Sequence, residues 1–214
     1  MENILINDAI EFVKTVFEHD YSGHDYFHTI RVYKMATHIA MKENANMEIV
    51  QLAALLHDVD DIKLSPQTHE NKEKAVGFLQ SHHVDEKTVD AIIQIISEIS
   101  FAGKDSVVPE TIEGKCVQDA DRLDAIGAIG IARAFAYGGS HNRMIYHPDI
   151  KPAVDLDKEQ YDNHISTTIN HFYEKLFHLK DMMNTVTAKE VAQERETYMK
   201  EYLVEFMKEW DGIR

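Results

Sequence analysis

The sequence contains few of the residues that cross-link or interrupt a chain. Cys116 is its single cysteine, so no disulfide can form within the chain, which fits a reducing compartment. We expect this thiol to be a small buried apolar group rather than a nucleophile. No stretch approaches the roughly 20 apolar residues of a membrane-spanning helix, and the start of the sequence lacks the basic region and unbroken apolar run of a signal peptide. These absences predict a cytoplasmic protein that does not enter a membrane.

Basic side chains are also scarce. Lysine and arginine number 22 against 37 aspartates and glutamates, which gives a net charge of −15. A surface this negative disfavours binding to nucleic-acid polymers and anionic lipid. It would also repel a small phosphorylated substrate, so such a substrate would need a local attraction, and a bound cation is the simplest source of one.

Several motifs of phosphate and acyl chemistry are missing from the chain. The sequence has no Walker loop, no dinucleotide glycine fingerprint and no GxSxG elbow. It has no CxxC pair, which excludes a structural zinc ribbon.

Only four prolines and nine glycines interrupt the sequence, and apolar residues recur at three- and four-residue spacing almost throughout. This pattern predicts amphipathic helices and, without strand alternation, an all-α fold. The segment EIVQLAALLHDVDD is the most apolar of them and should be central. Residues 138–157 form a long irregular stretch of the kind that serves as a lid or binding loop. The expected helices cover about 4–18, 25–42, 46–60, 70–81, 85–99, 109–138 with allowance for a break, 158–180 and 187–210.

The adjacent residues His57 and Asp58 follow the apolar run LAALL. Neighbouring helical side chains point about 100° apart, so both reach one point only near the edge of a helix. Buried polar groups are costly without partners, and a metal ion would satisfy both. Taken alone, however, the His-Asp dipeptide fits a hydrogen-bonded histidine beside a capping aspartate better than it fits a metal site.

Two other polar residues lie where apolar packing is expected. His28 lies on an amphipathic helix close to its apolar face, where a lone histidine is usually a packing residue. Asp121 lies between Ala120 and Leu123, where a carboxylate is costly without a cation beside it. An ion pair with Arg122 or another basic residue is the simpler explanation for this aspartate.

Taken in order, His28, His57–Asp58 and Asp121 resemble the H…HD…D pattern of the HD superfamily of metal-dependent phosphohydrolases. The flanking segments HDYFHTIRV, LAALLHDVDD and DADRLDAIGAIGIAR are similar to its bacterial branch of predicted or nucleotide-directed phosphohydrolases, as is the tail INHFYEKLFHLKDMMNT. The resemblance covers essentially the whole chain. It implies one HD domain over residues 1–214, a helical bundle with a metal site at its centre and a C-terminal helical extension at about 158–214.

The resemblance also implies which residues hold the metal. The ligands would be His28, His57, Asp58 and Asp121. Asp121 is preferred to Asp119 and Asp124 because the last aspartate of the family typically lies in an Ala-Asp-x-Leu context, here ADRL, and Asp124 is its main rival. One divalent ion is expected, with Mn, Ni, Co, Fe, Mg and Zn not distinguished.

Such an ion lowers the pKa of water and screens charge on phosphorus, so the expected reaction is cleavage of a phosphate ester or pyrophosphate bond. The favoured substrate is a small phosphorylated metabolite, and a nucleotide is the favoured class. In related helical nucleotidases an acid placed like Asp61 assists the attacking water. Asp61 lies four residues after His57, which would put both on one helical face; a solvated acid is an equal alternative. The sequence leaves the substrate-binding residues and the oligomeric state open.

Alternative functions depend on the number of metal ions. Enzymes of this superfamily with two metals carry more histidines after the HD pair, and His69, His82 and His83 lie in that interval. The expected helix from 86 to 100 contains no histidine, which favours one metal. It argues against a cyclic-dinucleotide phosphodiesterase and an HD-type di-iron oxygenase. A non-catalytic module that senses metal and nucleotide is the main alternative.

Overall fold

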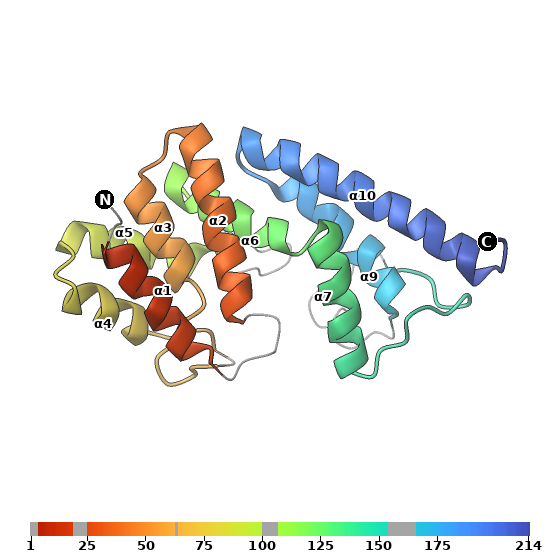
Figure 1. The fold of residues 1–214 in the computed structure, drawn as a ribbon, viewed down its shortest axis with the longest axis horizontal. Helices are drawn as coiled ribbons and strands as arrows, with labels where there is room; N and C mark the ends of the chain where they lie inside the picture. Colours follow the sequence, from red (N-terminus) through yellow and green to blue (C-terminus); the bar gives the residue numbers. More distant parts are fainter. Residues whose placement is uncertain (1–3, 19–24, 63, 100–106, 154–165) are drawn as a thin grey trace. The chain divides into compact units, whose positions relative to one another are not determined.

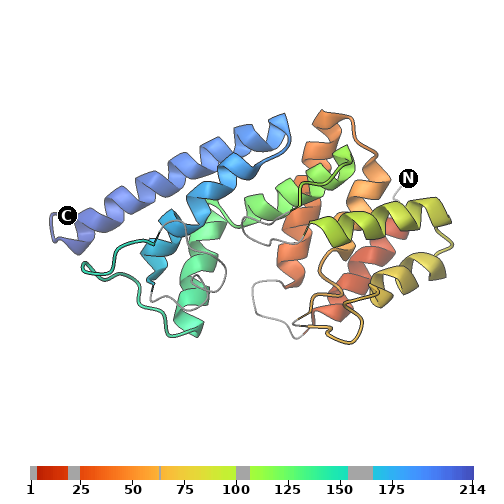
Figure 2. The same cartoon turned by 180° about the vertical axis from the view of Figure 1, so that it is seen from behind.

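A computed structural model describes residues 4–18, 25–62, 64–99, 107–153 and 166–214. All regular structure in these ranges is helical, which confirms the predicted all-α fold (Figures 1 and 2). None of the described helices is long and apolar enough to cross a membrane. The chain forms two compact units, residues 1–121 and 122–214. The expectation of a single domain with an extension from about 158 stays a prediction.

The first unit is organised around a buried apolar helix. This helix is α3, and it packs against α1, α2 and α5 (Figure 1). Val50 and every residue from Leu52 to Leu56 are fully buried, as the apolar segment predicts. The helices of this unit are α1 (Ile4–Val16), α2 (Tyr26–Glu43), α3 (Met47–Leu56), α4 (Glu73–Ser81), α5 (Glu86–Glu98) and α6 (Ile112–Asp124), whose last residues belong to the second unit.

Side-chain caps fix where α2 and α3 begin. Oδ1 of Asp25 accepts the backbone N–H of His28 at 2.8 Å, which satisfies one of the open donors at the start of α2. Asn46 caps α3 in the same way, and its own N–H donates to Oε1 of Glu113 at 2.8 Å. The start of α3 is therefore tied to the first turn of α6.

The second unit contains a cluster of aromatic rings. Phe135, Phe172, Tyr202 and Phe206 form a series of ring contacts, and Trp210 stacks on Phe206. The helices of this unit are α7 (Gly127–Ser140), α9 (Thr168–Glu174), the 3-10 helix η2 (Leu176–Met182) and α10 (Val186–Trp210). The break between α6 and α7 matches the break that the sequence allowed.

Two expected helices are wrong in part. The helix expected to reach Asp60 ends at Leu56, and turns follow. In the range 158–180, Thr167 is extended and its Oγ1 accepts the N–H of Asn170, so α9 begins only at Thr168. The chain leaves α-helical geometry at Lys175 and continues as η2. Residues 158–165, and 154–157 of the expected long loop, lie outside the described residues.

Cys116 is completely buried within α6. Burial, with smaller contributions from nearby carboxylates that include Asp119, raises the pKa of its thiol to about 12. Because the thiolate is the reactive form, this side chain is a packing residue, as the sequence predicts.

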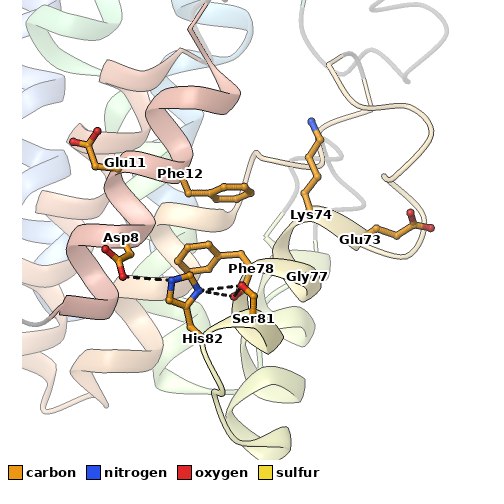
Figure 3. A pocket seen from close by; sticks show the side chains of 9 residues that line it. All are labelled: Asp8, Glu11, Phe12, Glu73, Lys74, Gly77, Phe78, Ser81 and His82. Carbon is orange, nitrogen blue, oxygen red and sulfur yellow. Dashed lines mark hydrogen bonds and ion pairs between the residues drawn. The ribbon is translucent and has the colours of Figure 1, made fainter.

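A groove of about 510 Å³ lies in the first unit between α1 and α4 (Figure 3). The rings of Phe12 and Phe78 stack in it with centroids 5.0 Å apart, and His82 lies against Phe78. Nε2 of His82 lies 3.4 Å from Oδ2 of Asp8, which links the two helices. Gly77 lines the same groove, and a Cβ added there would meet nothing within 4 Å.

We expect Gly77→Ala to raise the free energy of unfolding by about 0.5–1 kcal/mol, because alanine restricts the unfolded chain in a helix interior that has room for its methyl group. Urea denaturation followed by circular dichroism measures this change. Gly114→Ala is the matched control and should destabilise, because its Cβ would lie 2.7 Å from that of Pro109. A loss of stability in Gly77→Ala would contradict the assignment of open space at this position.

Candidate metal centre

Three helices of the first unit bring the predicted site residues together. His28 lies in the first turn of α2, and His57 and Asp58 directly follow α3. Asp121 lies in α6. The caps at Asp25 and Asn46 set the starts of α2 and α3, so they also set how these side chains are presented.

His57 is oriented by the helix that precedes it. Its Nδ1 lies 2.9 Å from the carbonyl oxygen of Ala54, which accepts only if Nδ1 carries the proton. This hydrogen bond turns Nε2 toward Asp58, whose Oδ2 lies 3.2 Å away. Nε2 of His57 is buried and makes no hydrogen bond within the described residues. Its lone pair is thus available to a ligand in the neutral form of the ring.

His28 connects the remaining groups. Its Nε2 lies 3.5 Å from Oδ2 of Asp58 and 3.4 Å from Oδ1 of Asp121. The rings of His28 and His57 meet edge to face, with centroids 5.4 Å apart. Side chains from three segments that are distant in sequence therefore come together, and Nε2 of His28 lies within reach of both carboxylates.

The site is closed on the histidine side and open on the carboxylate side. The side chains of His28 and His57 are 0% and 3% exposed, whereas those of Asp58 and Asp121 are 15% and 27% exposed. A small ion or an oxygen of a substrate could therefore reach the point of convergence past the two carboxylates.

The electrostatics of the site favour positive charge. Burial disfavours the charged form of His57, but the Asp58 and Asp121 carboxylates outweigh it and raise the pKa of His57. Burial likewise opposes ionisation of Asp121, but the rings of His28 and His57 outweigh it and lower the pKa of Asp121. The carboxylates of Asp58 and Asp121 therefore favour a cation beside them, either a proton on an imidazole or a metal ion.

The donor set fits a divalent metal. Ligand atoms of His28, His57 and Asp58 all lie within 4.8 Å of one another, the only such group of three or more found in the described part of the chain. Asp121 borders this group through its contact with His28. Imidazole nitrogen with carboxylate oxygen suits first-row metals such as Mn, Fe, Co, Ni and Zn. How many ions bind, and which, stays a prediction.

The other candidate aspartates have different surroundings. Asp124 is 4% exposed and pairs with Arg133 in the second unit, so it does not take the place of Asp121. Asp119 is fully buried. Arg122, the expected partner of Asp121, donates through Nη1 to the carbonyl of Met182.

Asp61 is partly exposed, but the argument that placed it on one helical face with His57 is wrong because α3 ends before both. Its backbone carbonyl accepts the N–H groups of Leu64 and Ser65. Its role as a base stays a prediction. Sequence reasoning missed Asp60, which is 1% exposed and accepts backbone hydrogen bonds from α4. No feature of the sequence identifies Asp60 as the acid that caps α4, because its partners are backbone N–H groups.

The additional histidines have other contacts. Nδ1 of His69 bonds to the carbonyl of Asp60 at 2.8 Å, and His82 lies in the groove between α1 and α4. His83 has a left-handed backbone, with a φ of 56°, at the end of α4. The expectation of a single metal ion stays a prediction.

Comparison with known proteins places the chain within a family. The HD domain model matches residues 25–126, a range that contains all four site residues. The uncharacterized protein YpgQ of Bacillus subtilis strain 168 is 39% identical over 204 residues, 94% of this chain and 92% of YpgQ. An HD-superfamily hydrolase of Bacillus thuringiensis is 44% identical over 96% of both chains, with a TM-score of 0.78. The crystal structure of B. subtilis YpgQ in complex with ADP is 38% identical over 96% of this chain and 100% of that chain, with a TM-score of 0.76.

We expect Asp121→Asn to affect metal binding and Asp124→Asn to affect stability instead. Asp121→Asn should weaken metal binding by at least about 10-fold, since altering even the groups that support metal ligands typically costs that much. Asp124→Asn should retain the metal but lower the melting temperature, because it weakens the buried pair with Arg133. Metal per chain by elemental analysis and thermal unfolding measure the two effects. Normal metal uptake by Asp121→Asn would exclude it as a ligand.

Proposed function

The chain belongs to the HD superfamily, and from that membership we propose that it is a metal-dependent phosphohydrolase whose ion is held by His28, His57, Asp58 and Asp121. Membership of this family supports a hydrolase activity in general. The observation behind the metal-dependent reaction is that two buried imidazoles lie within 3.5 Å of the carboxylates of Asp58 and Asp121.

A nucleotide is the proposed substrate. YpgQ, a relative at 38% identity, has been crystallised with ADP. The net charge of −15 would repel phosphates at long range, so recognition would depend on the cation that the site holds. Scission of a phosphate ester or of a pyrophosphate linkage is compatible with this arrangement.

The residues of the chain divide the work in the proposed reaction. A divalent ion held by these residues would lower the pKa of the attacking water and screen the charge on phosphorus. The Nδ1–H of His57 donates to the Ala54 carbonyl, so in the neutral ring the lone pair that would bind the ion lies on Nε2. Asp58 and Asp121 line the open side, where the phosphate would enter. Asp61 is proposed to take the proton of the attacking water.

The activity is tested with a panel of nucleoside mono-, di- and triphosphates and several divalent metals, with products identified by chromatography. We expect hydrolysis by the wild type, and loss of both turnover and metal in His57→Ala and in Asp58→Ala, with helical content retained. His82→Ala is the control histidine, because it lies in the groove against Asp8. Turnover in either site variant would refute the assignment. Binding of metal and nucleotide without any product would indicate a sensing module.

Asp61→Asn should retain the metal but lower kcat by about 100-fold or more, the range in which loss of a general base falls. The amide cannot accept the proton, whereas the four proposed ligands are unchanged. Steady-state kinetics with parallel metal analysis measures this separation. Glu70→Gln neutralises an exposed acid of the same segment and should leave kcat unaltered. An unchanged rate in Asp61→Asn would remove it from the reaction.

A further inference from the structure

Asp60 is a buried acid that the proposed reaction does not use, and it lies two residues beyond the proposed ligand Asp58. We propose that Asp60 is a positioning residue, which clamps the His57–Asp58 turn to the N-terminus of α4 and thereby sets the metal affinity of the site. This inference rests on the proposed function, because it concerns the same metal ion.

Both carboxylate oxygens of Asp60 are engaged by the first turn of α4. Oδ1 accepts the backbone N–H of Lys74 at 3.2 Å, and Oδ2 accepts that of Ala75 at 3.0 Å. The first N–H groups of a helix have no partners inside the helix, and a carboxylate there also interacts favourably with the helix dipole. Asp60 therefore satisfies two donors that α4 itself leaves open.

The helix has no cap of its own. The residue before it, Lys72, has a left-handed backbone with a φ of 51° and makes no side-chain cap hydrogen bond. In the same unit, α2, α3 and α5 are each capped locally, by Asp25, Asn46 and Asp85. The start of α4 thus depends on an acid that belongs to the segment of the metal site, and the dependence is mutual because Asp60 is held by α4.

The backbone carbonyls of Asp60 and of its two neighbours are also held, by donors from the segment 65–69. The carbonyl of Val59 accepts from Oγ of Ser65 at 3.1 Å, and that of Asp60 accepts from Nδ1 of His69 at 2.8 Å. The carbonyl of Asp61 accepts the N–H of Ser65 at 2.7 Å. Three consecutive carbonyls are therefore fixed, in addition to the carboxylate between them.

These contacts define the position of Asp58 from its far side. His57 is held from the near side by the Ala54 carbonyl, within the last turn of α3. Asp58 has only Val59 between it and the clamp, so a displacement of Asp60 would turn the Asp58 carboxylate away from His28 and His57. Groups that orient metal ligands typically change metal affinity by about 10- to 100-fold when they are removed.

The test compares Asp60→Ala with Asp85→Ala in the full-length chain. Both substitutions remove a carboxylate that accepts N–H groups of a first helical turn, since Asp85 accepts the N–H of Thr88 at 3.2 Å, but α5 contributes no residue to the site. Binding of Mn²⁺ and of Ni²⁺ is measured by calorimetry, and the environment of bound Mn²⁺ by electron paramagnetic resonance. We expect Asp60→Ala to raise the Kd by about 10-fold or more and to alter the spectrum, and Asp85→Ala to leave both unchanged.

Asp60→Asn separates positioning from folding. The amide oxygen can still accept one of the two backbone bonds, so this variant should bind metal with a Kd between those of the wild type and Asp60→Ala. It also replaces Asp60→Ala if that variant does not fold. Wild-type affinity in a folded Asp60→Ala or Asp60→Asn, with metal bound by the wild type, would overturn the positioning role alone. Failure of the wild type to bind either ion would overturn the proposed function and this inference with it.

Discussion

The metal site depends on the burial of α3. The second half of this helix, from Leu52 to Leu56, is fully buried, and the helix packs against α1, α2 and α5, so its depth in the unit is set mainly by apolar packing. Its last residues carry the chain to His57, where the helix ends and polar groups begin. A shift of the helix would expose Leu52 to Leu56, so the backbone position from which the His57 side chain projects is fixed. The caps of α2 and α3 then complete the arrangement.

The four convergent groups form a site that stabilises positive charge before any ion is considered. Each imidazole lies within 3.5 Å of a carboxylate, and burial of the rings strengthens these interactions by reducing the local dielectric constant. The same burial would make the carboxylates costly if nothing compensated them. A divalent cation resolves this conflict more completely than a shared proton does, because it can contact nitrogen and oxygen donors simultaneously.

Much of this arrangement could be predicted from the sequence because it depends on periodicity and on a recognisable order of residues. The helices from α1 to α7 follow from apolar spacing, and the resemblance to the HD superfamily selected Asp121 from three nearby aspartates. Sequence reasoning erred where a local feature ends a helix. Nothing in the apolar pattern shows that α3 stops at Leu56, or that Thr167 delays the start of α9.

The role of Asp60 was beyond sequence reasoning for a different physical reason. Its partners, Lys74 and Ala75, are backbone donors, which any residue type supplies, so their positions leave no trace in the pattern of side chains. A cap supplied from a distant part of the chain becomes visible only when the fold brings the two segments together. The same limit applies to Glu113, which reaches the N–H of Asn46 from another helix.

The aromatic cluster of the second unit has a practical consequence for spectroscopy. The sequence contains one tryptophan, and Trp210 lies in that unit beside Phe206 and Tyr146. Its indole is 49% exposed, so its emission should respond when α10 loses these neighbours. Fluorescence excited selectively at this tryptophan would therefore report the unfolding of the second unit rather than that of the unit with the metal site.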